Sequence, residues 1–231
     1  MYKEFSIIIP IYNEAQNILI LLDEIKNSIK SYKNYEIIVI NDSSTDNTID
    51  LLSKNIRNSN IHIINNQKNY GQSYSIHKGI QLAKSDIIVT IDGDGQNDPK
   101  DIEKLLNLYR QKKDVKLVGG IRNKRKDNIL KILSSKIANS LRSFILKDNC
   151  PDTGCALKVF DKKIFLTFIY FDGIHRFLPA LFNGYKYKTM FINVNHRNRK
   201  YGFSKYGTIK RALKGIIDII RVIKLINKKN D

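Results

Sequence analysis

Two aspartates follow an apolar run in the middle of the chain. Residues 87–91 read Ile-Ile-Val-Thr-Ile, and Asp92-Gly93-Asp94-Gly95 come next. The run predicts a buried strand, and because side chains alternate along a strand, Asp92 and Asp94 share one face at its end. The glycines remove side-chain bulk, so a metal-bound phosphate can approach the backbone, and carboxylate oxygens suit Mg²⁺ or Mn²⁺. Asp-Gly is also ordinary turn chemistry, so a plain polar turn is the alternative interpretation.

Two further polar clusters follow predicted strands nearer the N-terminus. Residues 5–9 predict a strand that Pro10 ends, and the polar corner 12–14 comes next. Residues 36–40 predict a second strand, which leads into the polar segment 41–46. In parallel sheets, ligands bind beyond the carboxyl ends of the strands. The clusters at 10–14, 41–46 and 92–98 are therefore expected to converge.

Strands and helices alternate along the first 120 residues. Strands are also expected over 61–64 and 115–118, and apolar spacing predicts helices around 18–29, 76–83 and 99–109, with Pro99 in the first turn of the last. A helix through 51–52 is expected to be capped by Ser44 or Thr45. This alternation predicts an α/β fold with a mostly parallel central sheet and helices on both faces.

The second half of the chain is more basic. Residues 129–146 have a long helical pattern, and 185–194 is a further strand candidate. Residues 208–227 have the pattern of a basic amphipathic helix, with apolar positions at Ile209, Leu213, Ile216, Ile220 and Ile223 and basic ones at Lys210, Lys214, Arg221, Lys224 and Lys228. Such a helix either packs on the core with a solvated charged face or docks on a membrane surface.

Composition limits the class of protein. The chain has 231 residues, 42% hydrophobic and 27% charged, which favours one globular domain with an appended segment. The net charge of +18 implies an anionic partner: nucleic acid, a phosphorylated substrate or an acidic membrane surface. No apolar run approaches the ~20 residues of a membrane helix, so we expect a cytoplasmic protein. Cys150 and Cys155 lack the companions of a zinc site and are expected to be reduced thiols.

The chain resembles the family 2 glycosyltransferases of the GT-A fold. Within them it is similar to the branch of dolichol-phosphate mannose synthase and bacterial polyprenyl-phosphate glycosyltransferases. In the first half the resemblance rests on segments 10–14, 39–46, 69–71 and 92–99, and in the second on segments 151–158, 171–181, 195–197 and 202–207. Two departures are that Asn41 stands where the wider family usually has aspartate, and that many relatives continue into membrane helices.

The resemblance implies a catalytic domain at 1–206, with a nucleotide-sugar-binding half (1–120) and an acceptor-binding half (121–206). Residues 207–231 would then be the basic helix with possible membrane-surface contact. The implied donor-binding residues are Pro10, Tyr12, Glu14, Asp42, Asp92, Gln96, His196, Arg197 and Ser204. Asp92, Asp94 and Gln96 would bind Mg²⁺ or Mn²⁺. Structural alternatives exist for some of these carboxylates: a turn for Asp42 and helix-terminus charges for Glu14, Asp46 and Asp98.

The acceptor half supplies cations by the same resemblance. Arg122, Lys131, Ser135 and Asn139 fit the branch's phosphate-binding pattern, and the last three share one helical face; an ordinary solvated face is the alternative. Lys205 belongs to the segment expected to close over the donor diphosphate. Asp152 is the candidate base or orienting group near the acceptor. His175 and Arg176 would recognise the sugar or acceptor, or are structural. Asp94, Asp152, Arg122, Lys131, Ser135 and Lys205 are thus the candidate catalytic residues.

The resemblance implies an inverting, metal-dependent glycosyltransferase at the cytoplasmic face of the membrane, peripherally associated with it. A sugar would pass from a UDP- or GDP-sugar to a polyprenyl phosphate, whose phosphate is already an anion and needs cations more than a base. The alternative enzyme transfers to a sugar hydroxyl of a surface glycan. A nucleic-acid-binding module would use the charge but leaves the acidic pair unexplained, and a nucleotidyltransferase usually has a glycine-rich loop after the first strand. We expect no nucleic-acid partner.

Overall fold

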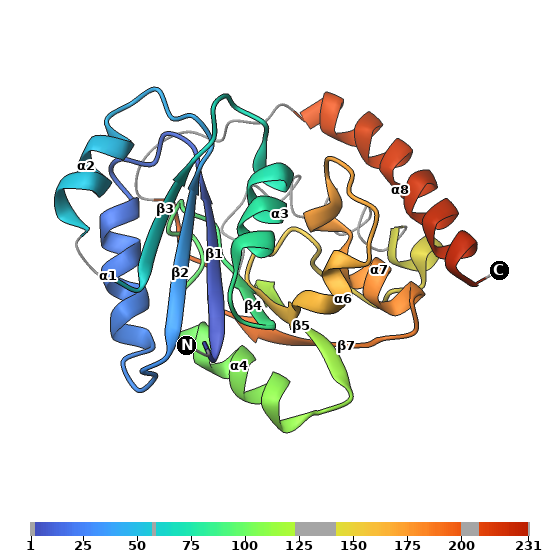
Figure 1. The fold of residues 1–231 in the computed structure, drawn as a ribbon. Coiled ribbons are helices and arrows are strands. Elements are labelled where there is room, and N and C mark those ends of the chain that lie inside the picture. The colour runs from blue at the N-terminus through green and yellow to red at the C-terminus, as the bar shows by residue number, and fades with distance from the viewer. Residues whose placement is uncertain (1–2, 57–58, 123–141, 200–207, 231) are drawn as a thin grey trace.

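The computed structural model describes residues 3–56, 59–122, 142–199 and 208–230, with side chains in the last helix described for 215–229. Within these residues one seven-stranded sheet has the order β3-β2-β1-β4-β6-β5-β7 (Figure 1). Its strands are β1 (Phe5–Ile11), β2 (Tyr35–Asn41), β3 (Ile61–Asn65), β4 (Ile87–Thr90), β5 (Val115–Arg122), β6 (Lys158–Asp161) and β7 (Lys188–Val194). Strand β6 runs antiparallel to β4 and β5, and the other pairings are parallel.

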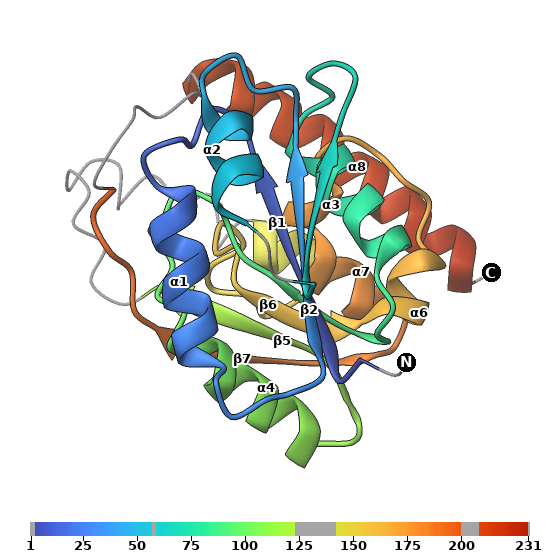
Figure 2. The same cartoon turned by 60° about the vertical axis from the view of Figure 1, so that its left-hand side comes forward.

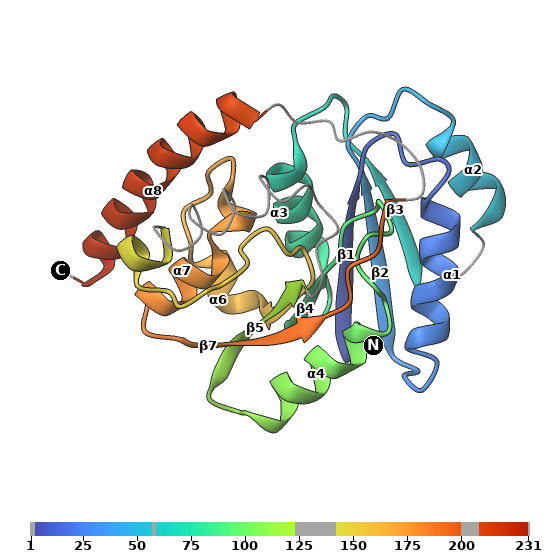
Figure 3. The same ribbon diagram turned by 180° about the vertical axis from the view of Figure 1, so that it is seen from behind.

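Helices cover both faces of the sheet (Figure 2), as the view from behind also shows (Figure 3). Because side chains alternate along β1, Ile7 and Ile9 join the core on one face, with α1 (Ile18–Ser28), α2 (Thr48–Asn55) and α4 (Asp101–Gln111). Ile8 joins the core on the other face, with α3 (Gln72–Leu82), α6 (Lys162–Leu166), α7 (Leu178–Gly184) and α8 (Thr208–Asn230). A short 3-10 helix, η1 (Ile174–Arg176), precedes α7. The predicted mostly parallel sheet with helices on both faces is confirmed.

Strand β1 does not end at Pro10, as the sequence predicts, but continues to Ile11 beside β2. The reason is the length of β4, the short strand that pairs with β1 on its other side. The Ile8 carbonyl accepts the Ile91 N–H at 3.2 Å, and β4 itself ends at Thr90. The main-chain groups of position 10 point to the same side as those of position 8, beyond the end of β4. The missing N–H of proline therefore removes no hydrogen bond of the sheet there.

The sequence also misses β6 and misplaces one helix cap. Strand β6 has four residues, and its first and last, Lys158 and Asp161, are charged. This leaves too little apolar pattern to predict a strand. Helix α2 begins at Thr48 after Asn47, which makes no side-chain cap bond. Ser44 and Thr45 bond instead to the corner after β1, so their polar groups are used between loops rather than at the helix.

Helix α8 is present where a basic amphipathic helix was predicted, but its inner face differs from the expected apolar side. Val222 and Asp218 are buried against the protein, and Ile219, Ile223, Leu225 and Ile226 pack around them. Ile216, Ile217 and Ile220 are 58%, 59% and 51% exposed. Of the two alternatives for the apolar side, packing on the core therefore does not hold for Ile216 and Ile220, and membrane-surface docking stays a prediction. The buried Asp218 faces Arg176, its ion-pair partner at 2.9 Å. Side chains 209–214 lie outside the described residues.

Both cysteines are free and buried, as expected. Burial raises the pKa of the Cys150 thiol to about 11, so it stays protonated at neutral pH. Among the described helices, none is both long and apolar enough to cross a membrane.

Candidate active site at the carboxyl ends of the strands

The loops after β1 and β2 are joined by direct hydrogen bonds. Asn13 has a positive φ of 54°, a conformation that asparagine tolerates better than most residues. Its main-chain N–H donates to Ser44 Oγ at 2.9 Å, and its side-chain oxygen accepts the Thr45 N–H at 2.7 Å. The Glu14 N–H donates to Thr48 Oγ1 at 3.0 Å. The first two predicted clusters therefore meet at the sheet edge, beside the N-terminal end of α2, which is the positive end of its helix dipole.

Asp42 is buried and holds the loop that follows β3. One carboxylate oxygen accepts the Tyr70 N–H at 3.0 Å and the Asn66 side-chain amide at 2.8 Å, and the other accepts the Gly71 N–H at 2.7 Å. The carboxylate thus holds the loop after β3, and its contact with the donor stays a prediction. Asn41 acts nearby, bonding to Asn65 and to the Ser44 N–H.

Asp92 lies at the end of β4 and is bonded to the first turn of α3. Gln72 Nε2 donates to Asp92 Oδ1 at 2.6 Å. Burial raises the pKa of Asp92 and the negative charge of Asp94 raises it further, whereas Lys158, Arg122 and Arg199 lower it. The two carboxylates therefore repel each other in a partly desolvated place, and positive groups surround them.

Gly93 between them allows this close packing. A Cβ on Gly93 would lie 2.5 Å from Ile11 Cγ2 and 3.2 Å from the Pro10 carbonyl oxygen. Only glycine lets the β4 loop cross so near to β1.

Residues 195–199, which follow β7, lie across the loop that follows β4. Asn97 and His196 form an antiparallel bridge, and the Arg197 N–H donates to the Gln96 carbonyl at 2.8 Å. The Arg197 guanidinium contacts Glu24 of α1 and Asp98, each at 2.6 Å. Two segments a hundred residues apart are thereby fixed to each other beside the acidic pair.

Arg199 is the direct partner of Asp94. Its Nη2 lies 2.7 Å from Asp94 Oδ2 and 3.8 Å from Glu14 Oε1. The sequence pattern does not single out Arg199, although it stands two residues after Arg197 in the same basic segment. Only the path of 195–199 across the β4 loop shows which of these arginines reaches Asp94.

The residues present fit a divalent cation. Among the described residues no three acidic, histidine or cysteine side chains cluster as a complete metal cage. Magnesium, however, is commonly bound through one or two carboxylates while substrate phosphates and water complete its shell. Asp92 and Asp94 supply such a pair, and their mutual repulsion, together with the arginine drawn to Asp94, shows that the place favours positive charge. The Gln96 N–H bonds Asp94 Oδ1 at 3.1 Å, so Gln96 lies beside the pair.

Arg122 and Asp152, predicted separately, form one buried ion pair. Arg122 Nε and Nη2 each lie 2.7 Å from a different oxygen of Asp152, a bidentate arrangement. Burial lowers the pKa of Arg122, but the hydrogen bond and charge of Asp152 outweigh it, so the net shift is upward. Gly154 packs so closely that a Cβ there would lie 2.7 Å from Arg122 Nη2. A carboxylate used in this way orients the arginine.

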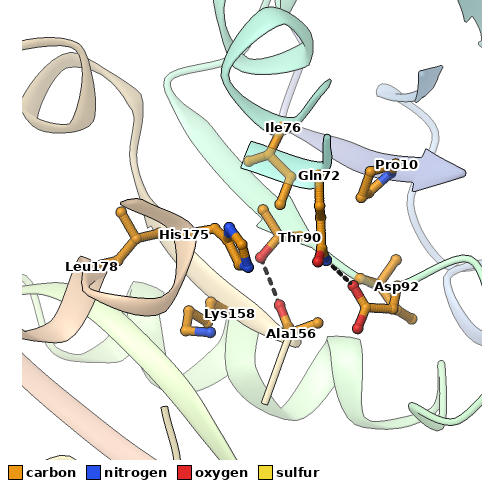
Figure 4. Close-up of a pocket in the computed structure, with 10 residues that line it drawn as sticks. Pro10, Gln72, Ile76, Thr90, Asp92, Ala156, Lys158, His175 and Leu178 are labelled. Atoms are coloured by element: carbon orange, nitrogen blue, oxygen red, sulfur yellow. Dashed lines mark hydrogen bonds between the residues drawn. The ribbon is translucent and has the colours of Figure 1, made fainter. Parts of the chain in front are cut away.

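A small pocket lies between the strand ends and η1 (Figure 4). His175 enters it from η1, and Lys158 enters it from β6. Lys158 is not among the site residues that the sequence predicts. Lys158 is buried and donates to the Cys155 carbonyl. Arg176, the neighbour of His175, pairs instead with Asp218. The pocket is lined by Pro10, Gln72, Ile76, Thr90, Ile91, Asp92, Ala156, Lys158, His175 and Leu178.

The structure thus brings together most of the described candidates: Pro10, Glu14, Asp42, Asp92, Asp94, Gln96, Arg122, Asp152, His196 and Arg197, with Tyr12 half-buried in the corner after β1. Lys131, Ser135, Asn139, Ser204 and Lys205 lie outside the described residues.

Sequence comparisons place the chain among known transferases. A family model described as "Glycosyl transferase family 2" matches residues 6–168. The chain is 33% identical over 211 residues to an undecaprenyl-phosphate 4-deoxy-4-formamido-L-arabinose transferase of Pectobacterium carotovorum, covering 90% of this chain and 64% of that protein. It is 33% identical over 226 residues to a dodecaprenyl-phosphate galacturonate synthase of Rhizobium johnstonii, covering 95% of this chain and 66% of that protein. The chain therefore spans slightly less than two thirds of these relatives.

Structural comparison gives more distant likenesses. Mannosyl-3-phosphoglycerate synthase from Rubrobacter xylanophilus superimposes with a TM-score of 0.70 at 14% identity, covering 95% of this chain and 72% of that one. Glucosyl-3-phosphoglycerate synthase from Mycobacterium tuberculosis, in complex with Mn²⁺, UDP-glucose and phosphoglyceric acid, gives 0.70 at 15% identity, covering 96% and 78%. The same enzyme has been crystallised with Mg²⁺ and UDP. At these identities the likeness shows the fold alone.

The hydrogen bonds of Asp42 predict its effect on stability. Asp42→Ala removes the acceptor for two main-chain N–H groups and one amide, and we expect the free energy of unfolding to fall by about 2–4 kcal/mol. Urea denaturation measures this. The control is Asp50→Ala, an exposed aspartate in α2, for which we expect a change within about 0.5 kcal/mol. Equal stability of the two variants would show that Asp42 does not hold the loop.

Proposed function

This chain belongs to glycosyltransferase family 2, and from that premise we propose that it transfers a sugar from a nucleotide-diphosphate donor to a polyprenyl phosphate. Its fold is GT-A, as predicted from the sequence. The observation that carries the proposal is the pair Asp92 and Asp94 at the carboxyl edge of the sheet, with Arg199 and Arg122 close by. An acidic pair that can hold a cation, next to arginines that can hold phosphates, suits a reaction between two phosphate-bearing substrates.

In this proposal the first half of the chain binds the donor. Asp92 and Asp94, with Gln96 beside them, would hold Mg²⁺ or Mn²⁺, and the cation would offset the charge that develops on the departing diphosphate. Pro10, Tyr12 and Glu14 would contact the nucleoside, with Asp42 acting through the loop that it supports. His196, Arg197 and Ser204 are the proposed contacts from the second half. Structural neighbours crystallised with Mn²⁺ or Mg²⁺ and UDP support the use of a divalent cation.

Arg199 would act at the same place. Its guanidinium already lies at Asp94 and close to Glu14, so it needs only a small movement to bond a diphosphate held at the acidic pair. A planar guanidinium binds phosphate oxygens in pairs, which an ammonium does not.

The Arg122–Asp152 pair favours a phosphate acceptor over a sugar hydroxyl. A hydroxyl acceptor needs a general base, and the carboxylate near the acceptor half, Asp152, has both oxygens bonded to Arg122. A polyprenyl phosphate is already an anion and needs an oriented cation, which Asp152 provides in Arg122. Lys131, Ser135 and Lys205 remain proposed acceptor or diphosphate contacts on sequence grounds. Two relatives named as polyprenyl-phosphate sugar transferases support this acceptor class. Attack by the phosphate directly on the donor sugar would invert its anomeric centre.

We further propose that residues 1–206 form the catalytic domain, with its halves at 1–120 and 121–206, and that the helix at 207–231 lies against an anionic membrane surface on the cytoplasmic side. Ile216, Ile217 and Ile220 are exposed together on α8, and Arg221 and Lys224 follow them within the next turn. Apolar side chains flanked by cations suit the boundary between acyl chains and anionic headgroups.

Turnover tests the proposed reaction. Purified protein with Mn²⁺, UDP- or GDP-sugars and a short polyprenyl phosphate is expected to form the lipid-linked sugar, whereas the corresponding polyprenol is not a substrate. Asp94→Asn is expected to lower kcat/KM by about 10²-fold or more, because it removes a ligand of the charge-stabilising cation. The matched control is Asp114→Asn, an exposed carboxylate paired with Lys188 away from the site, which should keep full activity. Transfer to a glycan hydroxyl but not to the lipid phosphate would support the alternative acceptor class.

Donor binding is tested by thermal unfolding. A nucleotide sugar that binds only the folded protein raises its stability by about 2.7 kcal/mol at a hundred times its dissociation constant. We expect this stabilisation to require Mn²⁺ in the native protein and to be absent in Asp94→Ala. The readout is the ligand-induced change in Tm of each protein, since loss of the Arg199 contact also changes the Tm of the variant without ligand. A full metal-dependent shift in Asp94→Ala would remove Asp94 from the metal site.

Vesicle binding tests the membrane surface. The double variant Ile217→Ser and Ile220→Ser removes two half-exposed apolar side chains, and each 1.4 kcal/mol lost is about tenfold in affinity. We expect cosedimentation with phosphatidylglycerol vesicles to weaken by about tenfold or more, since burying one such side chain contributes about 1.5–3 kcal/mol. Leu82→Ser, at a half-exposed position on α3, is the control. Equal binding by both variants would show that these α8 positions do not meet the lipid.

A further inference from the structure

A buried carboxylate lies between α8 and η1. Asp218 is 1% exposed, and its oxygens lie 2.9 Å from Arg176 Nη2 and 3.6 Å from Arg221 Nη1. The two arginines also pack over rings, Arg176 over Phe177 and Arg221 over Phe171. The carboxylate is therefore neutralised from both sides and fixed in direction, which a buried charge requires.

The turn before η1 is shaped to meet this carboxylate. Gly173 has φ of 111°, in the region that favours glycine. A Cβ on Gly173 would lie 2.8 Å from Asp218 Oδ2 and 2.9 Å from Arg176 Nη2. The backbone conformation therefore favours glycine, and a side chain there would have to displace the Asp218 carboxylate or the Arg176 guanidinium.

The other side of the same turn bonds to the active site. The Gly173 N–H donates to Ser73 Oγ at 2.7 Å, and Ser73 Oγ lies 2.7 Å from His175 Nδ1. Ser73 follows Gln72, whose amide holds Asp92 at 2.6 Å, and His175 and Asp92 line the same pocket (Figure 4). A continuous set of contacts thus leads from α8 to the acidic pair.

We propose that Asp218 is a positioning residue: by holding Arg176 and the Gly173 turn, it fixes His175 in the pocket beside Asp92 and Lys158. The helix with the exposed isoleucines and the site are then parts of one bonded unit, although α8 contributes no described side chain to the pocket. The inference rests on the proposed function only in taking the pocket to be part of the active site. Its structural part, the placing of the turn by Asp218, stands independently of the substrate.

Amide exchange tests the structural part. In Asp218→Asn we expect the Gly173 N–H to exchange with solvent about tenfold faster or more, because the turn that presents it to Ser73 loses its ion pair. Amides of β1 and α1 should keep their protection. Asp114→Asn, which breaks an exposed ion pair, is the control and should leave Gly173 unchanged. Unchanged Gly173 exchange in folded Asp218→Asn, or an equal loss of protection at β1, would overturn the proposal.

Kinetics test the positioning role. We expect Asp218→Asn to lower kcat by about tenfold or more, as expected when a group near the chemistry is misplaced, while the KM for nucleotide sugar stays within about twofold. Asp218→Asn leaves both Arg176 and Arg221 without this carboxylate, so the double variant Asp218→Asn with Arg176→Gln is used if the single variant fails to fold. In the double variant position 176 carries no charge and Arg221, whose side chain is 47% exposed, is open to water, so the variant should fold but keep the low kcat and the fast Gly173 exchange. Recovery of native kcat in it would show that the ion pair only stabilises the fold, and would overturn the proposal.

The outcomes separate this inference from the proposed function. If the native protein turns over no polyprenyl phosphate, the proposed acceptor is wrong, while Gly173 exchange still decides whether Asp218 places the turn. If native turnover is normal, and Asp218→Asn has the native kcat and the native exchange rate at Gly173, the proposed function stands and the positioning role is wrong.

Discussion

The repulsion between Asp92 and Asp94 is the constraint on which the rest of the site depends. Two carboxylates at the end of one buried strand cannot both stay charged in a desolvated place without compensation. The structure answers with a hydrogen-bond donor from α3, Gln72, and with a guanidinium from the segment after β7, Arg199. Each comes from a different element, so the acidic pair ties the first turn of α3 and residues 195–199 to the end of β4. A divalent cation in the same place would replace much of this compensation.

The carboxylates divide into those that hold structure and those that face the site. Asp42 supports a loop, Asp98 pairs with Arg197, and Asp152 orients Arg122. Each of the last two therefore lowers the effective charge of an arginine while fixing its direction. A chain with a net charge of +18 has positive groups in excess, so what its site needs is orientation more than additional cations. In the proposed function, the bidentate pair at Arg122 would let an acidic side chain serve an anion-binding site without touching the anion.

Most of the fold and the place of the site could be predicted from sequence, because both depend on local patterns. Alternating strands and helices predicted the sheet, and polar residues after 9, 40 and 91 predicted its active edge. Strand β6 could not be found, because four residues carry too little periodicity. Arg199, Gln72 and Lys158 could not be found either, since their roles depend on which distant loop each side chain reaches. The sequence also left two partners open for the apolar side of α8, because its pattern does not show that Asp218 is buried against Arg176.

Asp218 shows what such a buried ion pair contributes beyond attachment. Val222, Ile219 and Ile226 already pack α8 on the core, and replacing a buried ion pair by apolar residues of similar volume is often neutral or stabilising. Stability alone therefore does not account for a carboxylate at this position. An apolar contact tolerates sliding and rotation, whereas an ion pair that also touches a glycine turn defines one distance and one direction. Ser73 passes that geometric definition to His175, so the outer helix takes part in shaping a pocket that none of its described side chains lines.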